Sequence, residues 1–492
     1  MDQRARKKQK VTTEGTDSAA TIPPPPDRPC QCHFYVSKKK RYCRLPTKAT
    51  KKYCGEHLQY EEGGDAGNHS AKENGNTATT HENKKGERVP CPYDPAHSTY
   101  LSTFETHLLK CNSRPPDKQP SYYEKDVNIS VALPEDQKSF AAELEQHRLK
   151  FMHKSMPWMA KVKLDALPFD ELVSFCRRVQ ALAEEMKVED IPEEWEDHSV
   201  MSEKRSTVSN TKHVDQQASL LGHLQNQGAL PKSTDTIGSQ CFVEFGAGKA
   251  ELSYCVSKAM EKADSSDASH YYIFVDRKNM RNKFDSQIHR PPKAQAHRLL
   301  LDIKDLKLSG FDLLSESERN SKSLSLSAIS KHLCGSATDL TLKCLANYKQ
   351  DQEANGIKTP VKAIVIALCC HHICRFHMYP NQDFLRKHDI DEAFFARLAK
   401  MSSWAVSGAR DEQHAKSEDE ETENDDNTEE NAVRVTTLLP SPLRFHLGHI
   451  AKRILDHGRM LYLRQCGFAN ARIVHYISRN TSLENVCLIC SD

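Results

Sequence analysis

Apolar and polar positions in the second half of the chain alternate in the manner of an α/β sheet. From about residue 211, short apolar runs predict strands, and most of these are separated by stretches with helical periodicity. The predicted strands are Cys241–Phe245, Tyr271–Val275, Arg298–Ile303, Leu326–Ser330, Ala363–Leu368, Ala471–Ser478 and Val486–Ile489. Such alternation favours an open, mostly parallel α/β sheet. A turn at Arg479–Asn480 joins the last two strands, so we expect these to pair antiparallel.

Polar stretches divide the first half of the chain. Residues 1–29 and 61–88 contain few apolar residues, which predicts a disordered basic tail and a linker. Two compact segments rich in Cys and His occupy 30–58 and 90–112. A helical segment is predicted over 130–190, where one helix face is formed by Leu172, Phe175, Val179, Leu182 and Met186.

Charge adds information at two places. The net charge of +2 conceals a basic excess in residues 1–60, which is typical of nucleic-acid binding. It also conceals an acidic block over Asp411–Glu430, which is typical of a solvated loop. The α/β domain, residues 211–492, is therefore expected to carry a disordered insertion over 408–432.

Length and composition restrict the class of protein. A chain of 492 residues with 38% hydrophobic and 28% charged residues is expected to form two or three domains. The longest apolar run, Ala363 to Cys370, is too short to span a membrane, and the polar N-terminus does not have the apolar core of a secretory signal. We therefore expect the 17 cysteines to be reduced, and metal binding is favoured over disulfides.

The first Cys/His segment predicts a zinc finger. Cys32, Cys43, Cys54 and His57 are spaced C-x10-C-x10-C-x2-H, and zinc takes four such ligands in a tetrahedron. So short a segment buries little apolar surface, so the metal must supply its folding energy. Ordinary buried cysteines are the alternative, but the surroundings are polar. Cys30 is a second candidate for the first ligand, and Cys32 is preferred because it gives equal spacing.

The second segment predicts another finger. Cys91, His97, His107 and Cys111 are spaced C-x5-H-x9-H-x3-C, and the last two are four residues apart on one predicted helix. The sequence thus predicts two structural zinc ions, with a finger that either binds RNA or braces the fold.

A glycine loop follows the first predicted strand of the α/β domain. Gly246 and Gly248 would allow a close approach of the backbone to a ligand, although a tight strand–helix turn alone explains them equally well. A dinucleotide is disfavoured because Glu251 occupies the position of the usual third glycine. Glu244 before the loop instead resembles the first motif of class I methyltransferases, which favours S-adenosylmethionine.

Two acids extend this predicted cofactor site. Asp276 ends the second strand, where a carboxylate can accept hydrogen bonds from both hydroxyls of a ribose. Asp302 lies near the end of the third predicted strand, where it could meet an adenine amino group.

Two polar clusters directly follow later strands. One contains Ser330–Gly335 and Ala337–Leu340, and the other is Cys369–Cys374. Ligands bind outside the carboxyl ends of strands in open α/β sheets, so both clusters are expected at the site. Metal binding by the second cluster is an alternative, but adjacent side chains rarely all point inward and methyl transfer needs no metal.

These segments together resemble one enzyme family. Lys212-His213 with Gln217–Leu224, Glu244–Gly248, Lys331–Leu340 and Cys369–His372 look like the eukaryotic tRNA ribose 2′-O-methyltransferases that act on the fourth nucleotide of the acceptor stem. Both fingers occur in that family in this order. The resemblance covers nearly the whole chain apart from the tail, the linker over 61–88, a second polar stretch over 196–210 and the acidic insertion.

The resemblance implies a class I S-adenosylmethionine-dependent methyltransferase fold, with a seven-stranded, mostly parallel sheet preceded by two zinc fingers. It also implies a tRNA substrate and a location in the cytoplasm or nucleus, and no membrane or DNA partner is expected. The chain has no Lys-Asp-Lys-Glu tetrad of the kind used by other ribose methyltransferases, so the catalytic assignment stays open.

The catalytic candidates follow from the chemistry of a ribose hydroxyl, which reacts faster when a base accepts its proton. His332 and His372 are the candidate bases, with Lys331 and Asp339 as orienting partners, because we expect all four just past strands. His332 could alternatively only shape its loop through a backbone hydrogen bond. Of the neighbours His371 and His372, one is expected to face the site while the other packs or caps.

Two other functions compete with this interpretation. A zinc-finger RNA-binding or splicing protein could retain an inactive methyltransferase fold, but Glu244, Gly246, Gly248, Asp276 and His372 are all intact. A methyltransferase for proteins or small molecules is the other, and the basic fingers argue against it.

Overall fold

The chain folds into two compact units, Met1–Arg114 and Pro115–Asp492. The computed structural model describes residues 30–36, 41–47, 51–54, 88–93, 98–111, 114, 118–133, 164–188, 190–232, 238–263, 268–277, 280, 283–315, 324–407 and 438–491. The predicted tail, nearly all of the linker, the first part of the helical segment and the acidic insertion lie outside these residues.

The described part of the first unit contains two small hairpins and one short helix. Strand β1 (Tyr35–Val36) pairs antiparallel with β2 (Arg41–Tyr42), and β3 (Arg88–Pro90) pairs antiparallel with β4 (Ser98–Tyr100). Helix α1 (Phe104–Lys110) follows one turn of 3-10 helix. Elements this short cannot build an apolar core.

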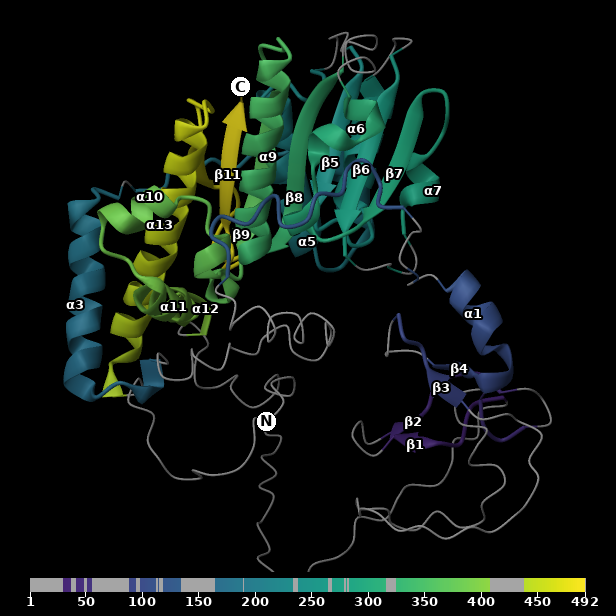
Figure 1. Cartoon of the computed structure of the whole chain (residues 1–492), viewed down its shortest axis with the longest axis horizontal. Coiled ribbons are helices and arrows are strands. Elements are labelled where there is room, and N and C mark those ends of the chain that lie inside the picture. The colour runs from purple at the N-terminus through teal and green to yellow at the C-terminus, as the bar shows by residue number, and fades with distance from the viewer. Residues whose placement is uncertain are drawn as a thin grey trace, which may run out of the picture. The chain divides into compact units, whose positions relative to one another are not determined.

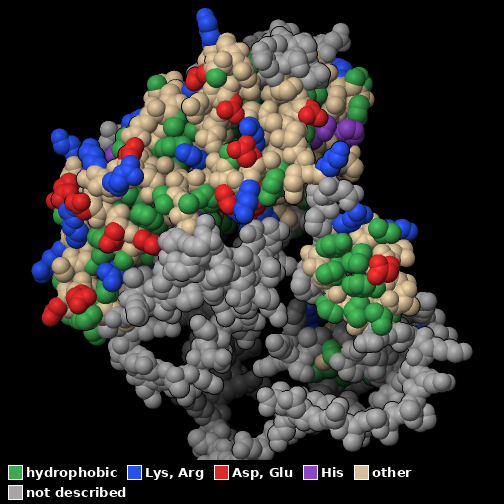
Figure 2. Space-filling view, viewed as in Figure 1, with side chains coloured by type: hydrophobic (Ala, Val, Ile, Leu, Met, Phe, Trp, Pro, Cys, Tyr) green, Lys and Arg blue, Asp and Glu red, His purple; other side chains and the backbone are tan. Residues whose placement is uncertain are grey.

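Several apolar side chains in the described part of this unit lie at the surface. Tyr93, Tyr100, Leu101 and Leu109 are exposed, and Figure 2 shows hydrophobic side chains gathered over α1. The buried cluster of the first hairpin segment consists of three cysteines with Phe34 and Tyr53 packed against them. A core made of thiols is expected where metal coordination replaces apolar packing.

The second unit is built on one seven-stranded sheet (Figure 1), whose order is β10-β11-β9-β8-β5-β6-β7. Strands β5 to β9 run parallel, whereas β11 is antiparallel to both β9 and β10. The strands are β5 (Gln240–Phe245), β6 (His270–Asp276), β7 (Ala294–Leu300), β8 (Ser325–Cys334), β9 (Val361–Cys369), β10 (Arg472–His475) and β11 (Val486–Ser491). The structure thus confirms the mostly parallel sheet and the antiparallel final pair.

Helices cover both faces of this sheet. Alternate strand residues pack toward opposite faces, as Phe242 and Val243 do, because the side-chain period of a strand is two. Helices α9 and α13 pack on one face, and α5 and α6 on the other. The helices that the structure describes in this unit are α3 (Phe169–Glu185), α4 (Ser202–Thr207), α5 (Lys212–Asn226), α6 (Glu251–Ala263), α7 (Asp285–Ile288), α9 (Ser336–Ala354), α10 (Gln382–Lys387), α11 (Glu392–Met401), α12 (Trp404–Ser407) and α13 (Ser441–Gln465).

A separate helical core lies beside the sheet. The predicted apolar face of α3, with Leu172, Val179 and Leu182, is buried together with residues of α10 to α13. The helical segment that precedes the α/β domain in sequence therefore packs within the second unit. Over the described ranges, no helix combines the length and hydrophobicity needed to cross a bilayer.

Three strand predictions require correction, and one of them is Ala471–Ser478, because β10 covers only Arg472–His475. Strand β7 covers Ala294–Leu300, earlier than the predicted Arg298–Ile303, because the Asp302 side chain accepts a hydrogen bond from the Lys304 N–H and starts a 3-10 turn. Strand β8 continues to Cys334 and does not end at Ser330, so the expectation that Lys331 and His332 lie just past the strand is wrong. They lie within it, at an irregularity of the pairing with β9 between Ser330 and Leu333.

Candidate functional site

The glycine loop links the central strand β5 to α6. Gly246 and Gly248 have φ angles of 63° and 51°, a region that favours glycine. A Cβ added at Gly246 would lie 3.1 Å from the His332 carbonyl oxygen, so the loop packs closely on β8. A Cβ added at Gly248 would meet no atom within 4 Å. The loop therefore opens onto space at Gly248, as a ligand-binding turn requires.

Glu244 lies beneath this loop and braces α6. Its buried Oε2 accepts hydrogen bonds from the Ser253 N–H at 3.0 Å and the Ser253 hydroxyl at 2.5 Å. Burial raises the pKa of Glu244 to about 7, although the two bonds from Ser253 oppose this rise. The carboxylate thus fixes the first turn of α6 and the position of the loop before it.

The two predicted acids hold turns at the same sheet edge. Asp276 is the last residue of β6, and its Oδ2 accepts a hydrogen bond of 2.7 Å from the Gly248 N–H. Asp302 follows β7, and its Oδ2 pairs with Arg277 at 3.2 Å. The structure therefore brings Asp276 to the glycine loop, while Asp302 shapes the turn after β7.

The bulged end of β8 carries a cluster of basic groups. Lys331 Nζ lies 3.2 Å from Nδ1 of His213, which is in the first turn of α5. The rings of His213 and His332 have centroids 6.4 Å apart. Bulges redirect side chains and are common beside active sites. The cluster is the described group best suited to proton transfer at this edge.

Desolvation sets the electrostatics of this cluster. Partial burial lowers the pKa of Lys331, and the nearby Lys204 lowers it further against the opposing effect of Glu251. Burial also lowers the pKa of His332, with contributions from Lys331 and His213. A neutral imidazole at neutral pH is able to accept a proton.

Sequence reasoning missed His213 as a site residue. It lies 118 residues before Lys331, and only the fold brings the two together. Lys212-His213 belongs to the segments that carry the family resemblance, and this is the signal in the sequence that could have identified His213.

Asp339 is placed in the core by a buried ion pair. Its Oδ1 and Oδ2 accept hydrogen bonds from Arg459 of α13 at 2.8 and 3.1 Å, and both side chains are fully buried. Arg459 also donates to the Gly335 carbonyl and to Oδ1 of Asp456. Asp339 therefore joins α9 to α13 and supports the turn after β8, with both oxygens directed at Arg459.

The adjacent histidines after β9 have different surroundings. His371 is buried, with Nε2 2.7 Å from Oδ1 of Asp456. His372 is half-buried in the same 3-10 turn. His371 is thus the packing member of the pair, and His372 is the more accessible one.

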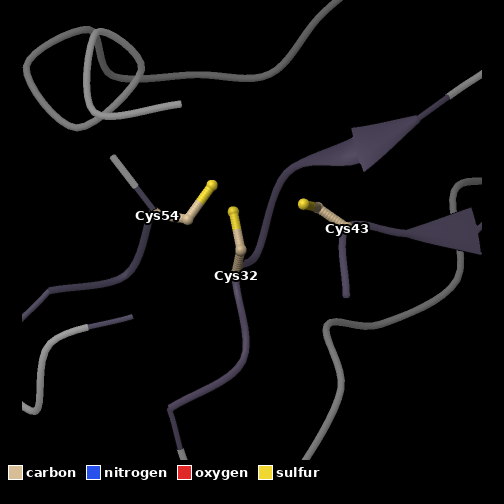
Figure 3. A group of neighbouring side chains, drawn as sticks. All are labelled: Cys32, Cys43 and Cys54. Carbon is tan, nitrogen blue, oxygen red and sulfur yellow. The ribbon is translucent and has the colours of Figure 1, made fainter. Parts of the chain in front are cut away.

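The first finger brings three predicted ligands together. The sulfur atoms of Cys32, Cys43 and Cys54 point toward one another (Figure 3) and lie within 4.8 Å of one another in a buried cluster. His57 lies outside the described residues, and Cys30 is exposed. Three converging thiols fit a zinc ion that would be completed by one further ligand.

The second finger shows the same arrangement. The ligand atoms of Cys91, His107 and Cys111 lie within 4.8 Å of one another, and the two sulfurs are 3.6 Å apart. His107 and Cys111 come from the end of α1, as their four-residue spacing predicts. His97 lies outside the described residues. This set also fits tetrahedral zinc.

A cavity of about 400 Å³ lies elsewhere in the second unit. It is lined by the middle of α9, residues around Asn128 and the turn near Ser309, and none of the predicted site residues lines it. The chemistry of the strand ends therefore defines the candidate site better than this cavity does.

Family models match three segments of the chain. The description "Methyltransferase TRM13" matches residues 215–491, "CCCH zinc finger in TRM13 protein" matches 31–58, and "U11-48K-like CHHC zinc finger" matches 88–112. Fold, fingers and strand-end cluster thus define a methyltransferase with two N-terminal zinc fingers. The chain belongs to the TRM13 methyltransferase family.

Relatives match over nearly the whole chain. "tRNA:m(4)X modification enzyme TRM13" of Saccharomyces cerevisiae is 30% identical over 503 residues, covering 94% of this chain and 96% of that protein. The "tRNA:m(4)X modification enzyme TRM13 homolog" of Homo sapiens is 30% identical, covering 96% and 97%. The "tRNA:m(4)X modification enzyme TRM13" of Yarrowia lipolytica is 32% identical, and the match covers 93% of this chain and 89% of that protein. No solved structure matches the chain.

Proposed function

We propose that this chain transfers a methyl group from S-adenosylmethionine to a ribose 2′-hydroxyl of tRNA, at the fourth nucleotide of the acceptor stem. Family membership supports methyl transfer, and the names of the relatives support tRNA as substrate. The observation that carries the proposal is the group formed by His213, Lys331 and His332 at the end of β8, beside a glycine loop that opens onto space.

The sheet order supports a class I methyltransferase fold and a place for the cofactor. Strands β6 and β7 lie on one side of β5, and β8 and β9 lie on the other. Ligands of open α/β sheets bind outside the carboxyl ends where the strand order reverses, here between β5 and β8. We place S-adenosylmethionine over Gly246 and Gly248, with Asp276 at its ribose and Asp302 toward its adenine. Glu244 would act indirectly, through Ser253 and α6.

Proton transfer is assigned to the histidines at this edge. When bound, the sulfonium of S-adenosylmethionine supplies an electrophilic methyl group. His332 would accept the proton of the ribose hydroxyl, and His372 is the second candidate. Lys331, held beside His213, would orient the hydroxyl or the neighbouring phosphate. Asp339 would support the edge through Arg459 and the Gly335 carbonyl.

The two zinc fingers would supply additional RNA affinity. Basic residues lie between the ligands of the first finger, and cationic side chains bind phosphates without sequence preference. Because thiolate ligands must stay reduced, we place the enzyme in the cytoplasm or nucleus.

The test uses the full chain, total tRNA and S-adenosylmethionine labelled in the methyl group. Label is expected in tRNA, and alkaline digestion should leave it in a dinucleotide, because a methylated 2′-oxygen cannot attack the adjacent phosphate. Label in mononucleotides would contradict ribose methylation. An RNA-binding protein with an inactive fold would bind tRNA and transfer no label.

A further inference from the structure

A third group of cysteine thiols lies at the ends of β8 and β9. We propose that Cys334, Cys369 and Cys370 bind a thiophilic d10 metal ion, Zn²⁺ or Cu⁺. Their sulfur atoms lie within 4.8 Å of one another, and those of Cys334 and Cys369 are 3.8 Å apart. Two thiolates on one tetrahedral zinc are separated by about 3.8 Å, given Zn–S bonds of about 2.3 Å. The Cys91 and Cys111 sulfurs of the second finger show a similar 3.6 Å separation.

The backbone explains how two adjacent cysteines can face one ion. Successive residues of a strand point to opposite faces, so Cys369 and Cys370 would diverge if β9 continued. Instead Cys370 has φ 51° and ψ 42°, a left-handed conformation that is uncommon outside glycine. This turn lets both sulfurs reach the Cys334 sulfur on the neighbouring strand, whose Cα pairs in register with that of Cys369.

Two further potential ligands of the same stretch, His371 and Cys374, have other partners. His371 turns to Asp456, and the Cys374 sulfur accepts a hydrogen bond of 3.1 Å from Arg459. The proposed metal site is therefore not formed by the consecutive cysteines and histidines of residues 369–374. It combines the last residue of β8 with two residues from the end of β9, and three thiolates select soft cations.

The surroundings of the group suit a bound cation. The Glu484 Oε1 accepts a hydrogen bond of 3.3 Å from the Cys370 N–H, so a carboxylate lies beside the thiols, and its Oε2 pairs with Lys452. A fourth ligand could be an oxygen of this carboxylate or a water. The metal would tie the end of β8, with Lys331 and His332, to the turn that carries His372. It would thereby hold the proposed catalytic groups in place.

Metal content of the full chain tests this proposal without any need for tRNA or methyl transfer. We expect three equivalents of zinc plus copper per wild-type chain by mass spectrometry, two of them in the fingers. The Cys334→Ser/Cys370→Ser variant should hold two, whereas Cys466→Ser, a half-buried control cysteine outside the group, should hold three. Whether the lost equivalent is zinc or copper identifies the ion. Two equivalents in the wild type, or three in the double variant, would overturn the proposal.

A second measurement covers the case in which the double variant does not fold. In the native wild-type chain, alkylation of the three thiols should be at least tenfold slower than after treatment with a strong chelator, with Cys466 as internal reference. Equal alkylation rates before and after chelation would overturn the site. A disulfide between two of these three cysteines in freshly isolated protein would also overturn the metal site, and would indicate that the cysteines form a redox-active pair.

Discussion

At the scale of single residues, the account depends on side chains that separate elements bring to the end of β8. Lys331 and His332 come from the bulge of β8, and His213 comes from the first turn of α5. Residue types and strand ends pointed to Lys331 and His332 from the sequence. His213 was not predicted, because nothing local in the sequence indicates contact with a residue 118 positions away.

His332→Ala should lower the rate of methyl transfer by roughly 10²–10⁴-fold if its imidazole is the base. The dissociation constants for S-adenosylmethionine and tRNA should stay within a factor of two or three. Single-turnover kinetics with His332→Ala and His372→Ala would measure this directly. Full turnover in both variants would show that neither is the base and that positioning alone accelerates the reaction.

Glu244 gives a prediction for stability and pH. Its pKa is about 7 in the folded chain against 4.5 ordinarily, so the folded state binds the proton more tightly. Stability from this group is present below pH 4.5 and is lost as pH rises through 7, by about 3 kcal/mol at most. Relative to the wild type, Glu244→Gln should therefore be more stable at pH 8 than at pH 5.

Urea unfolding at the two pH values measures this difference, and Glu203→Gln, an exposed residue of α4, controls for net charge. A Glu244→Gln effect that is equal at both pH values would contradict the buried-acid account.

At the scale of elements, apolar runs located the buried strands β5, β6, β8, β9 and β11 well, since buried strands are nearly continuous in hydrophobicity. Strand ends were less predictable. Strand β7 carries His297 and Arg298 within its span, and β8 continues through Lys331 and His332 because its pairing with β9 persists past the irregularity. Because these polar residues interrupt the apolar run, the hydrophobic pattern of the sequence does not indicate where the strand begins or ends.

The ion pair between α9 and α13 is likewise a contact that the local sequence does not predict. The sequence predicts Asp339 as an orienting partner of a catalytic base, and the fold buries it against Arg459, 120 residues away. Arg459→Met should destabilise the second unit by about 3–5 kcal/mol, because it leaves a buried carboxylate without its partner. Denaturant unfolding measures this.

The matched control is Arg178→Met, which breaks an exposed ion pair with Glu185 on α3 and should change stability by less than about 1 kcal/mol. Equal effects of the two substitutions would show that the Asp339–Arg459 pair contributes no more than a surface pair.

At the scale of the whole molecule, the two units have different sources of stability. The second unit has extensive apolar cores, whereas the buried cluster of the first finger is made of its cysteines. The sequence predicted this division from ligand spacing and polar linkers.

Removal of one finger ligand should therefore affect the first unit alone. Cys32→Ala should lose one zinc equivalent relative to the wild type and weaken tRNA binding, with unchanged affinity for S-adenosylmethionine. Cys30→Ala removes an exposed cysteine outside the thiol cluster and should retain all bound zinc. Loss of zinc in Cys30→Ala but not in Cys32→Ala would mean that Cys30 is the ligand.

The central claim is that the carboxyl ends of β5 and β8 bind S-adenosylmethionine over the glycine loop. The most direct measurement is equilibrium binding of this cofactor to Gly248→Ala and Gly356→Ala. Both glycines have positive φ and open space where a Cβ would lie, so both substitutions place a β-carbon on left-handed backbone, but Gly356 lies in the turn after α9. The account predicts one cofactor per wild-type chain, binding roughly tenfold weaker or more in Gly248→Ala, equivalent to about 1.4 kcal/mol, and unchanged binding in Gly356→Ala. Undiminished binding by Gly248→Ala, or no binding by the wild type, would contradict it.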